Sequence, residues 1–421
     1  MKKRRIVALL LSLMIATSAF YACNSDSKGG SADGQQQTES GKKNKNNDNS
    51  IKDDDNSVTM GKPGSGNTEG SQNIIMLVPG NSGSDSNIPQ KSSDDTVTAP
   101  EAKYTSPLTG LATTEALATQ RPVAIMFNNL KAALPQHGIS QMEVVYEAIV
   151  EGSITRLMGV ATDWSSLPTL GSIRSSRDYY IDFADCHNAI YVHAGGSELA
   201  YAQLGTRKTN NIDGTNGNRA SVNAFYRNQE RLKKGLGKEH TLFTSGSALA
   251  TAIAGNKYPT TLKSGFVSPF KFSSNPLNME GSAAKYVYVP FSTYAQSYFD
   301  YDAESGLYLK GQYLGLKSSL DKHDSPHVDG NNNEQLAFKN IIILFTKYTT
   351  VDSVGRQAIQ FTGSGTGYYI TDGKCKPIKW NRESRTGGYT LYESDGTTEL
   401  LLNRGKTYVG TLKTNTKVVY K

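Results

Sequence analysis

A long polar stretch limits which part of this chain can fold. Residues 24–103 contain no Phe, Tyr or Trp and consist mainly of Ser, Asn, Gly, Asp, Lys and Gln. Such a composition cannot bury enough apolar surface to offset the conformational entropy of folding, so a disordered linker is predicted. A flexible chain of eighty residues has a root-mean-square span of about 50 Å. The folded body is therefore predicted to begin near Tyr104.

The residues before this linker have the parts of a secretory signal. A basic head, Met1 to Arg5, is followed by an apolar run from Ile6 to Ala22 and then by Cys23. The run is short for a membrane span, and residues 1–22 are predicted to be a signal peptide. A cysteine directly after the cut is typical of bacterial lipoproteins, whose thiol takes two acyl chains, so Cys23 is the predicted lipidation site and membrane anchor. An ordinary secretory signal is the alternative, because the box before Cys23 has Phe and Tyr where Leu and a small residue are usual.

Charge and cysteine content exclude several classes of protein. The formal charge of +7 includes four cations of the leader, which leaves +3 on the mature chain. That is too little to indicate nucleic-acid binding. Cys186 and Cys375 can form a disulfide or remain two buried free thiols. There is no Cys-x-x-Cys and no His/Cys cluster, so thioredoxin-like and zinc-ribbon folds are excluded and no cofactor is predicted.

The segment 104–275 has the pattern of an α/β (α+β) domain with a mixed sheet. Short apolar, β-branched runs predict buried strands at 122–127, 144–150, 157–161 and 189–193. An apolar face predicts a helix over 176–186. Ser197 and Ser245 are predicted to cap two further helices. Strands mixed with helices favour a layered α/β structure.

The segment 276–421 is predicted to be mostly antiparallel β. Alternating or apolar runs predict strands at 285–290, 298–301, 308–313 and 340–345. Turn signals follow at Gly363-Ser364-Gly365, Asp372-Gly373, Asp395-Gly396 and Arg404-Gly405. Asp-Gly between alternating runs is typical of hairpins.

Several motifs, which follow one another along the chain in a fixed order, resemble those of a known family. They are Ser106 to Leu111, Arg121 to Met126, Pro135-Gln136, Glu147 to Arg156, Ser172 to Arg177, Ile190 to Ser197 and, in the second half, Pro326 to Asp329, the run from Asn340, Gly363 to Gly365 and Trp380. Together they are similar to the YerB-like family of Gram-positive lipoproteins, which carries a two-part domain of unknown function, DUF3048. The resemblance covers nearly all of Tyr104 to Lys421. It departs at Lys238 to Thr241, where Pro-His-Asn is expected, and in the spacing around Trp380. It implies a surface lipoprotein on the outer face of the cytoplasmic membrane and no established reaction.

Two carboxylates, one in the second predicted strand and one directly after it, are candidate catalytic groups. Glu147 and Glu151 lie four residues apart and would share one face of an extended strand. Such a pair can act as acid and base or bind a cation. The alternative is structural: Glu151 turns outward at the strand end and Glu147 pairs with an arginine.

Three arginines are candidates for binding an anion. Arg174 and Arg177 bracket two serines between a glycine turn and a predicted helix start, and Arg156 lies in the preceding strand region. Guanidinium groups beside a helix start favour a carboxylate or phosphate ligand. Internal ion pairs with Glu147, Glu151 or Asp178 are the alternative.

His193 ends a predicted strand and precedes Gly195 and Gly196. Ligands tend to bind at the carboxyl ends of strands in α/β sheets, and glycines allow close approach of the backbone. His193 is therefore a candidate proton carrier, and Gly195 and Gly196 are candidate ligand contacts. A buried histidine satisfied within the core is the alternative.

A polar loop in the second half contains His323, Asp324, His327 and Asp329. These residue types suit a metal, but Pro326 interrupts the spacing and no metal site is predicted. The alternatives are a polar turn, or a role for His327 and Asp329 in a cleft against the first domain.

Three functions remain open. The favoured one is a non-enzymatic binding protein that holds an anionic or polar cell-envelope ligand in an α/β cleft lined by Glu147, Glu151, Arg156, Arg174, Arg177 and His193. The second is an envelope hydrolase or transferase with Glu147 or Glu151 as base and His193 as proton shuttle. The third is a scaffold for other envelope proteins. The oligomeric state is not predicted.

Overall fold

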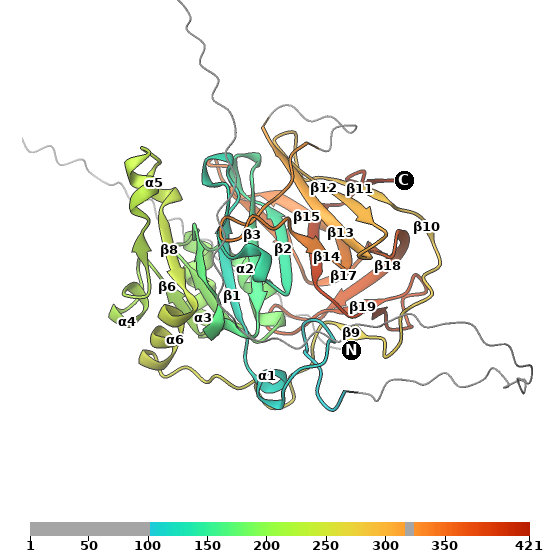
Figure 1. Cartoon of the computed structure of the whole chain (residues 1–421), viewed down its shortest axis with the longest axis horizontal. Coiled ribbons are helices and arrows are strands. Elements are labelled where there is room, and N and C mark those ends of the chain that lie inside the picture. Colours follow the sequence, from blue (N-terminus) through green and yellow to red (C-terminus); the bar gives the residue numbers. More distant parts are fainter. Residues whose placement is uncertain (1–101, 316–323) are drawn as a thin grey trace, which may run out of the picture. The chain divides into compact units, whose positions relative to one another are not determined.

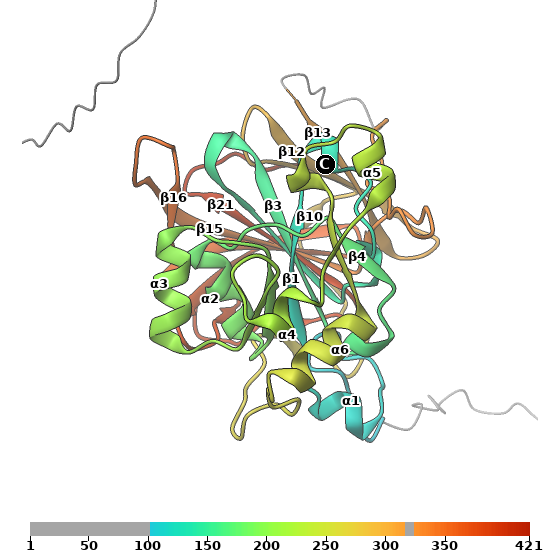
Figure 2. The same cartoon turned by 90° about the vertical axis from the view of Figure 1, so that its left-hand side faces the viewer.

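A computed structural model describes residues 102–315 and 324–421 of the chain (Figures 1 and 2). The predicted signal peptide, Cys23 and residues 24–101 lie outside the described residues. Among the residues described, no helix has the length and apolar character needed to cross a membrane.

A mixed sheet forms the centre of the described structure, and both halves of the chain contribute to it (Figure 1). Its strands, in spatial order, are β10 (Ser282–Ala283), β18 (Lys374–Arg382), β17 (Gly363–Thr371), β15 (Asn340–Thr350), β21 (Thr407–Lys413), β2 (Val144–Ile149), β3 (Thr155–Ala161), β1 (Val123–Asn128), β5 (Ile190–His193) and β6 (Asn211–Asp213). Two short strands pair at its side, β16 (Gln357–Gln360) with β15 and β19 (Thr390–Tyr392) with β18. Segments 104–275 and 276–421 therefore share one sheet, joined where β21 pairs in parallel with β2.

The central strands are mostly apolar because both faces of the sheet are covered. On one face pack α2 (Asp178–Cys186) and α3 (Glu198–Arg207), with Tyr180 and Phe183 of α2 in the shared core. On the other face packs α6 (Gly246–Gly255), through Leu249 and Ile253. Figure 2 shows α2 and α3 on one side of the β1 region and α6 on another.

A second, antiparallel sheet covers the same face as α6, but over the strands of the second half. Its strands, in spatial order, are β14 (Ala337–Phe338), β13 (Leu307–Leu314), β12 (Ala295–Asp302), β11 (Tyr286–Pro290) and β22 (Val419–Tyr420). Phe299 of this sheet packs on Tyr408 of the main sheet, with ring centroids 4.8 Å apart. The two sheets thus share one apolar core.

Smaller elements complete the described part. The short strands are β4 (Thr169–Gly171), β7 (Tyr226–Arg227) and β8 (Leu242–Ser245) in one group and β9 (Lys271–Phe272) with β20 (Leu401–Leu402) in another. The remaining α-helices are α1 (Glu115–Thr119), α4 (Arg219–Val222) and α5 (Gln229–Lys233). The 3₁₀ turns are η1 (Lys131–Ala133), η2 (Ile139–Gln141), η3 (Glu151–Ser153), η4 (Trp164–Ser166) and η5 (Lys238–His240).

The predicted fold class is confirmed: a mixed sheet with helices in the first half, and mostly antiparallel strands in the second. The predicted caps are also present, because Ser197 accepts a hydrogen bond from the Ala200 amide and Ser245 from that of Ala248. Cys186 and Cys375 are buried free thiols, so the disulfide alternative is wrong.

One predicted turn is wrong. Gly363-Ser364-Gly365 opens β17 instead of forming a loop. Gly365 faces Trp380 across the strand pair, and a Cβ atom there would lie 2.5 Å from the indole ring. The glycine therefore allows close packing inside the sheet. Asp372-Gly373 does form the predicted hairpin turn, between β17 and β18.

Candidate functional site

The carboxyl ends of the parallel strands gather at one edge of the main sheet. Strands β15, β21 and β2 are parallel neighbours, as are β1, β5 and β6. Strand β3 runs in the opposite direction between β2 and β1, so its first residues lie at the same edge: Arg156 is paired with Asn128, and Thr155 with Ile149. We call this the carboxyl edge. Ligands of α/β sheets commonly bind outside such an edge.

Glu151 holds two of the predicted arginines at this edge. Strand β2 ends at Ile149, and Glu151 begins η3. Its carboxylate accepts hydrogen bonds from both Nε (2.9 Å) and Nη2 of Arg177, and from Nη2 of Arg156 (3.1 Å). Burial alone would raise the pKa of Glu151, but the Arg177 bonds and the Arg156 charge outweigh burial and lower it to about 2. This is the internal ion pairing that stood as the alternative to ligand binding.

Arg156 is buried in the arginine cluster, by which we mean Arg156, Arg174 and Arg177 with Glu151. Its side chain is 3% exposed, and its Nη1 donates to the carbonyl of Ser175 at 2.6 Å. Burial and the neighbouring charge of Arg177 lower its pKa to about 10. A ligand cannot reach this guanidinium without moving Glu151 or Ser175.

Arg174 differs from the other two arginines because its guanidinium is unpaired. Its backbone is fixed between two strand ends: its amide donates to Met126 of β1, and its carbonyl accepts from Ala194 after β5. The residue is half-buried, and its side chain forms no hydrogen bond or ion pair with any described residue. Burial and the charge of Arg177 lower the pKa of Arg174, whereas Glu239 opposes the shift.

His193 is a buried histidine of the core. It is fully buried, its Nδ1 donates to the Gly195 carbonyl at 2.8 Å, and its Nε2 lies 3.2 Å from Oδ1 of Asn211. Burial lowers its pKa, although the nearby Asp213 carboxylate opposes the shift. The amide of Gly195 already donates to Asp213 at 2.8 Å, and Gly196 pairs with Ser176.

Glu147 lies on the other face of the sheet from the arginine cluster. Its neighbours in β2, Tyr146 and Ala148, belong to the core under α2, so Glu147 points to the opposite face. The prediction that Glu147 and Glu151 share a strand face is wrong, because the strand ends between them. The carboxylate of Glu147 is 1% exposed and accepts hydrogen bonds from Thr155, Ser297 and Tyr408 at 2.7 to 2.9 Å.

The cation beside Glu147 is a lysine and not the expected arginine. Nζ of Lys310, on β13, lies 3.7 Å from Glu147 and is fully buried. Burial lowers the pKa of Lys310, and Glu147 opposes that shift. The sequence contains one signal for this pair, a lone lysine in the alternating run 308–313. Its partner Glu147 could not be identified from the sequence, because the two residues meet only when the two sheets pack together.

His327 and Asp329 lie against the first half of the chain as predicted, but in a sealed contact and not in a cleft. Nζ of Lys310 donates to Nδ1 of His327 (3.1 Å), whose Nε2 donates to Gln136 (2.8 Å). Burial and the Lys310 charge hold the pKa of His327 well below its ordinary value. Asp329 accepts from the amides of Gly138 and Ser140 at 3.0 and 2.8 Å.

Asp324 lies in the described part and His323 outside it. Among the residues described, no group of three or more His, Cys, Asp or Glu side chains is placed to hold a metal ion.

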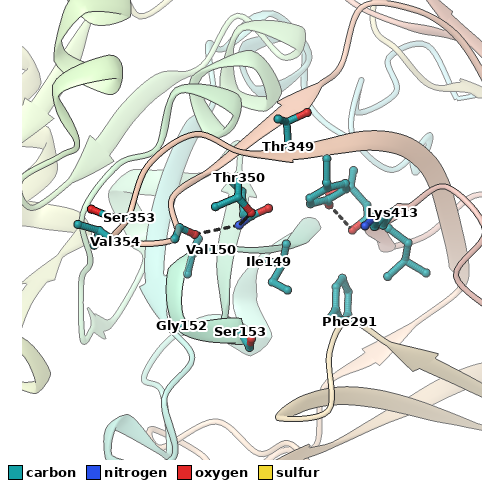
Figure 3. Close-up of a pocket in the computed structure, with 15 residues that line it drawn as sticks. Ile149, Val150, Gly152, Ser153, Phe291, Thr349, Thr350, Ser353, Val354 and Lys413 are labelled. Carbon is teal, nitrogen blue, oxygen red and sulfur yellow. Dashed lines mark hydrogen bonds between the residues drawn. The ribbon is translucent and has the colours of Figure 1, made fainter.

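A cavity of about 700 Å³ opens at the carboxyl ends of β2, β21 and β15. Ile149, Thr350 and Lys413 from the three strand ends line it, together with Phe291 and the η3 turn at Gly152, as Figure 3 shows. Lys413 is the one charged side chain among the described residues that line it. The sequence did not indicate this cavity, because three strands far apart in the chain form it only once their parallel pairing is known.

Two family models match the chain in order. The first, described as the N-terminal domain of a protein of unknown function (DUF3048), matches residues 108–259, and the corresponding C-terminal domain matches residues 287–409. The chain belongs to this family.

Two comparisons extend that result. A protein of Bacillus subtilis (strain 168) named "Putative lipoprotein YerB" is 28% identical over 292 residues, which cover 68% of this chain and 81% of the relative. The crystal structure of the YerB protein from Bacillus subtilis matches with a TM-score of 0.61 and 24% identity, over 74% of this chain and 97% of that one. The second likeness shows the fold of the family, and neither assigns a reaction.

Proposed function

We propose that this member of the YerB-like family is a lipoprotein anchored through Cys23 to the outer face of the cytoplasmic membrane. We propose further that its carboxyl edge binds an anionic ligand of the cell envelope. The leader sequence and the name of the Bacillus subtilis relative, a putative lipoprotein, support the anchor. A linker with a span of about 50 Å would let the folded body reach ligands in the wall above the membrane.

The unpaired guanidinium of Arg174 is the observation that carries the ligand proposal. Arg156, Arg174 and Arg177 supply three positive charges and Glu151 one negative charge, which leaves +2, or +1 if the nearby Glu239 is included. Arg156 and Arg177 are occupied by Glu151 and carbonyls. Arg174 keeps all its donors for a ligand, and hydrogen bonds to an anion there would be charge-assisted.

The cavity at the ends of β2, β21 and β15 supports a ligand larger than a single anionic group. Its volume of about 700 Å³ lies within the roughly 300–1,000 Å³ range of small-molecule sites. The η3 turn separates it from the arginine cluster, since Gly152 lines the cavity and Glu151 holds Arg156 and Arg177. A repeating anionic polymer placed along the carboxyl edge would contact both Arg174 and Lys413.

The alternative of an envelope hydrolase has less support. Glu147 is buried among five polar partners, Glu151 is held by two arginines with a pKa of about 2, and His193 is sealed in the core. A general base needs access to a substrate proton. Glu147 and His193 lack that access in this arrangement, and Glu151, although its side chain is 23% exposed, is held in its ionised form by two arginines and is therefore a weak base. A binding protein is the favoured proposal.

Calorimetric titration of the full chain in detergent with glycerol phosphate oligomers tests the proposal. Wild-type protein is expected to bind, and Arg174→Ala to weaken binding at least about tenfold, because a charge-assisted contact contributes roughly 1.5–3 kcal/mol. Arg219→Ala is the control, since Arg219 is an exposed arginine in α4. Equal affinity of the Arg174→Ala and Arg219→Ala variants would contradict the proposal, as would an uncharged oligosaccharide that binds equally well.

A further inference from the structure

We propose that a second anion site, for a phosphate-like dianion, lies at the opposite edge of the sheet. A cavity of about 220 Å³ there is lined by Arg121, Arg207, Lys208 and Lys263. Arg121 directly precedes Pro122 and β1, and Ala189, which also lines the cavity, precedes β5. The cavity therefore lies at the amino ends of these strands, away from the carboxyl edge and from Arg174.

Two buried polar groups in the lining lack a partner. The side chain of Arg207 is 5% exposed, and its Nε donates to Gln203 (3.0 Å). Its Nη1 donates to Asp185 (2.9 Å) and to the carbonyl of Arg385 (3.1 Å), and forms an ion pair with Asp182 (2.8 Å). Its Nη2 is buried and makes no hydrogen bond with any described residue, and the same holds for Oγ1 of Thr209. Buried polar groups are nearly always hydrogen-bonded, so a donor and a hydroxyl without a partner in two residues of one cavity lining point to a ligand.

The charge around the cavity is positive after all ion pairs are counted. The neighbouring cluster is neutral, with three carboxylates and three guanidinium groups: Asp178, Asp182, Asp185, Arg207, Arg382 and Arg385. Arg121, Lys208 and Lys263 add three positive charges, and none of them forms an ion pair with a described residue. Arg121 donates only to neutral oxygens, among them the carbonyl of Asn188 (2.5 Å) and Oδ1 of Asn210 (2.6 Å).

Two helix ends reduce this charge but do not cancel it. Asp185 and Arg207 lie in the last turns of α2 and α3, whose carbonyl ends each carry roughly half a negative charge. Three positive charges less about one leave about +2. A dianion matches this value.

The size of the cavity and the type of its donors indicate a small oxyanion. The cavity is smaller than the roughly 300–1,000 Å³ of sites for drug-sized ligands, so it fits a free phosphate or the terminal phosphate of a larger molecule. Guanidinium donors and lysine ammonium groups are the usual protein partners of phosphate oxygens.

Calorimetric titration of the full chain with inorganic phosphate tests the site. Lys208→Ala/Lys263→Ala removes two exposed cations of the lining, and we expect phosphate binding to weaken at least about tenfold, with the melting temperature of the phosphate-free protein unchanged. The matched control is Lys233→Ala/Lys374→Ala, two exposed lysines outside the lining, which should bind as wild type.

Two further variants separate this site from the carboxyl edge. Thr209→Val keeps the shape of the side chain and removes the open hydroxyl, so phosphate affinity should fall several-fold. Arg174→Ala should leave phosphate affinity unchanged. The inference is overturned if wild-type protein does not bind phosphate, or if the Lys208→Ala/Lys263→Ala variant binds it as wild type does. It is also overturned if Arg174→Ala alone abolishes binding. Titration with glycerol 3-phosphate then distinguishes a free phosphate from a phosphate ester.

Discussion

At the scale of single residues, the candidate groups divide by whether their charge is already matched. Glu147 and Lys310 neutralise one another in the core, and Glu151 is held by Arg156 and Arg177. Among the predicted site residues that the structure describes, Arg174 is the one that carries, at a half-buried position, a charge with no ion-pair partner in the described part of the chain. Residue type indicated which side chains could bind or react with a ligand. Packing decides which of those side chains are left without a partner inside the protein.

Removal of Glu147 should destabilise the fold strongly. Glu147→Ala leaves the fully buried Lys310 without its counter-ion, and we expect the free energy of unfolding in urea to fall by about 3–5 kcal/mol. Adding Lys310→Met should restore part of that loss. Glu393→Ala breaks the more exposed pair with Lys376 and should cost less than about 1 kcal/mol. A similar effect of Glu147→Ala and Glu393→Ala would contradict this description of the core.

Stability should fall in acid partly through Glu151. Its folded pKa of about 2 lies below the ordinary glutamate pKa of 4.5, so its ionised form stabilises the fold fully above about pH 4.5 and loses this contribution as the pH falls toward 2. Solvent around this partly exposed carboxylate screens the ion pairs, so the lost contribution is on the order of 1–2 kcal/mol, less than the full shift would give.

Urea unfolding between pH 7 and pH 2.5 measures this effect. Glu151→Gln should flatten the acid part of the stability curve, whereas Glu304→Gln, at an exposed turn, should retain the wild-type slope. If Glu151→Gln follows the wild-type curve in parallel, the ion pairs with Arg156 and Arg177 contribute nothing to stability.

At the scale of elements, local pattern predicted strands and caps well but not their environment. The runs that became β1, β2, β3 and β5 are apolar because they are buried on both faces, and the caps of α3 and α6 follow from one serine each. Gly363-Ser364-Gly365 was mispredicted because glycine marks both turns and close packing. The partner that decides between the two, Trp380, comes from the neighbouring strand β18.

The same substitution at two glycines should therefore have opposite effects. Gly365→Ala places a methyl group 2.5 Å from the Trp380 ring and should destabilise the protein by about 1–3 kcal/mol. Gly205→Ala, within α3 and with open space around its Cβ position, should stabilise it by about 0.4–1 kcal/mol. Thermal unfolding measures both, and destabilisation by Gly205→Ala to the same extent would contradict the helix assignment.

At the scale of the whole molecule, the two matched domains of the family share one sheet. The parallel pairing of β21 with β2 joins the segments matched by the two family models, and Lys310, His327 and Gln136 connect them a second time. Sequence patterns distinguished the halves by their strand character. They could not show the joint, because parallel pairing between distant strands leaves no local periodicity.

The described part should unfold in a single step. The two tryptophans, Trp164 and Trp380, report on the first and second halves. The Trp164→Phe and Trp380→Phe variants each keep one tryptophan. In each variant, the fluorescence of that tryptophan and the far-ultraviolet circular dichroism should change at the same urea midpoint. Two separated midpoints in either variant would show that the halves unfold independently.

The central claim is that Arg174 at the carboxyl edge binds an anionic envelope ligand. The most direct measurement is a crystal structure of the chain with a bound glycerol phosphate oligomer. The account predicts a phosphate oxygen about 2.7–2.9 Å from a guanidinium nitrogen of Arg174, with the oligomer extending toward Lys413. A ligand bound elsewhere on the molecule, with Arg174 uncontacted, would contradict it.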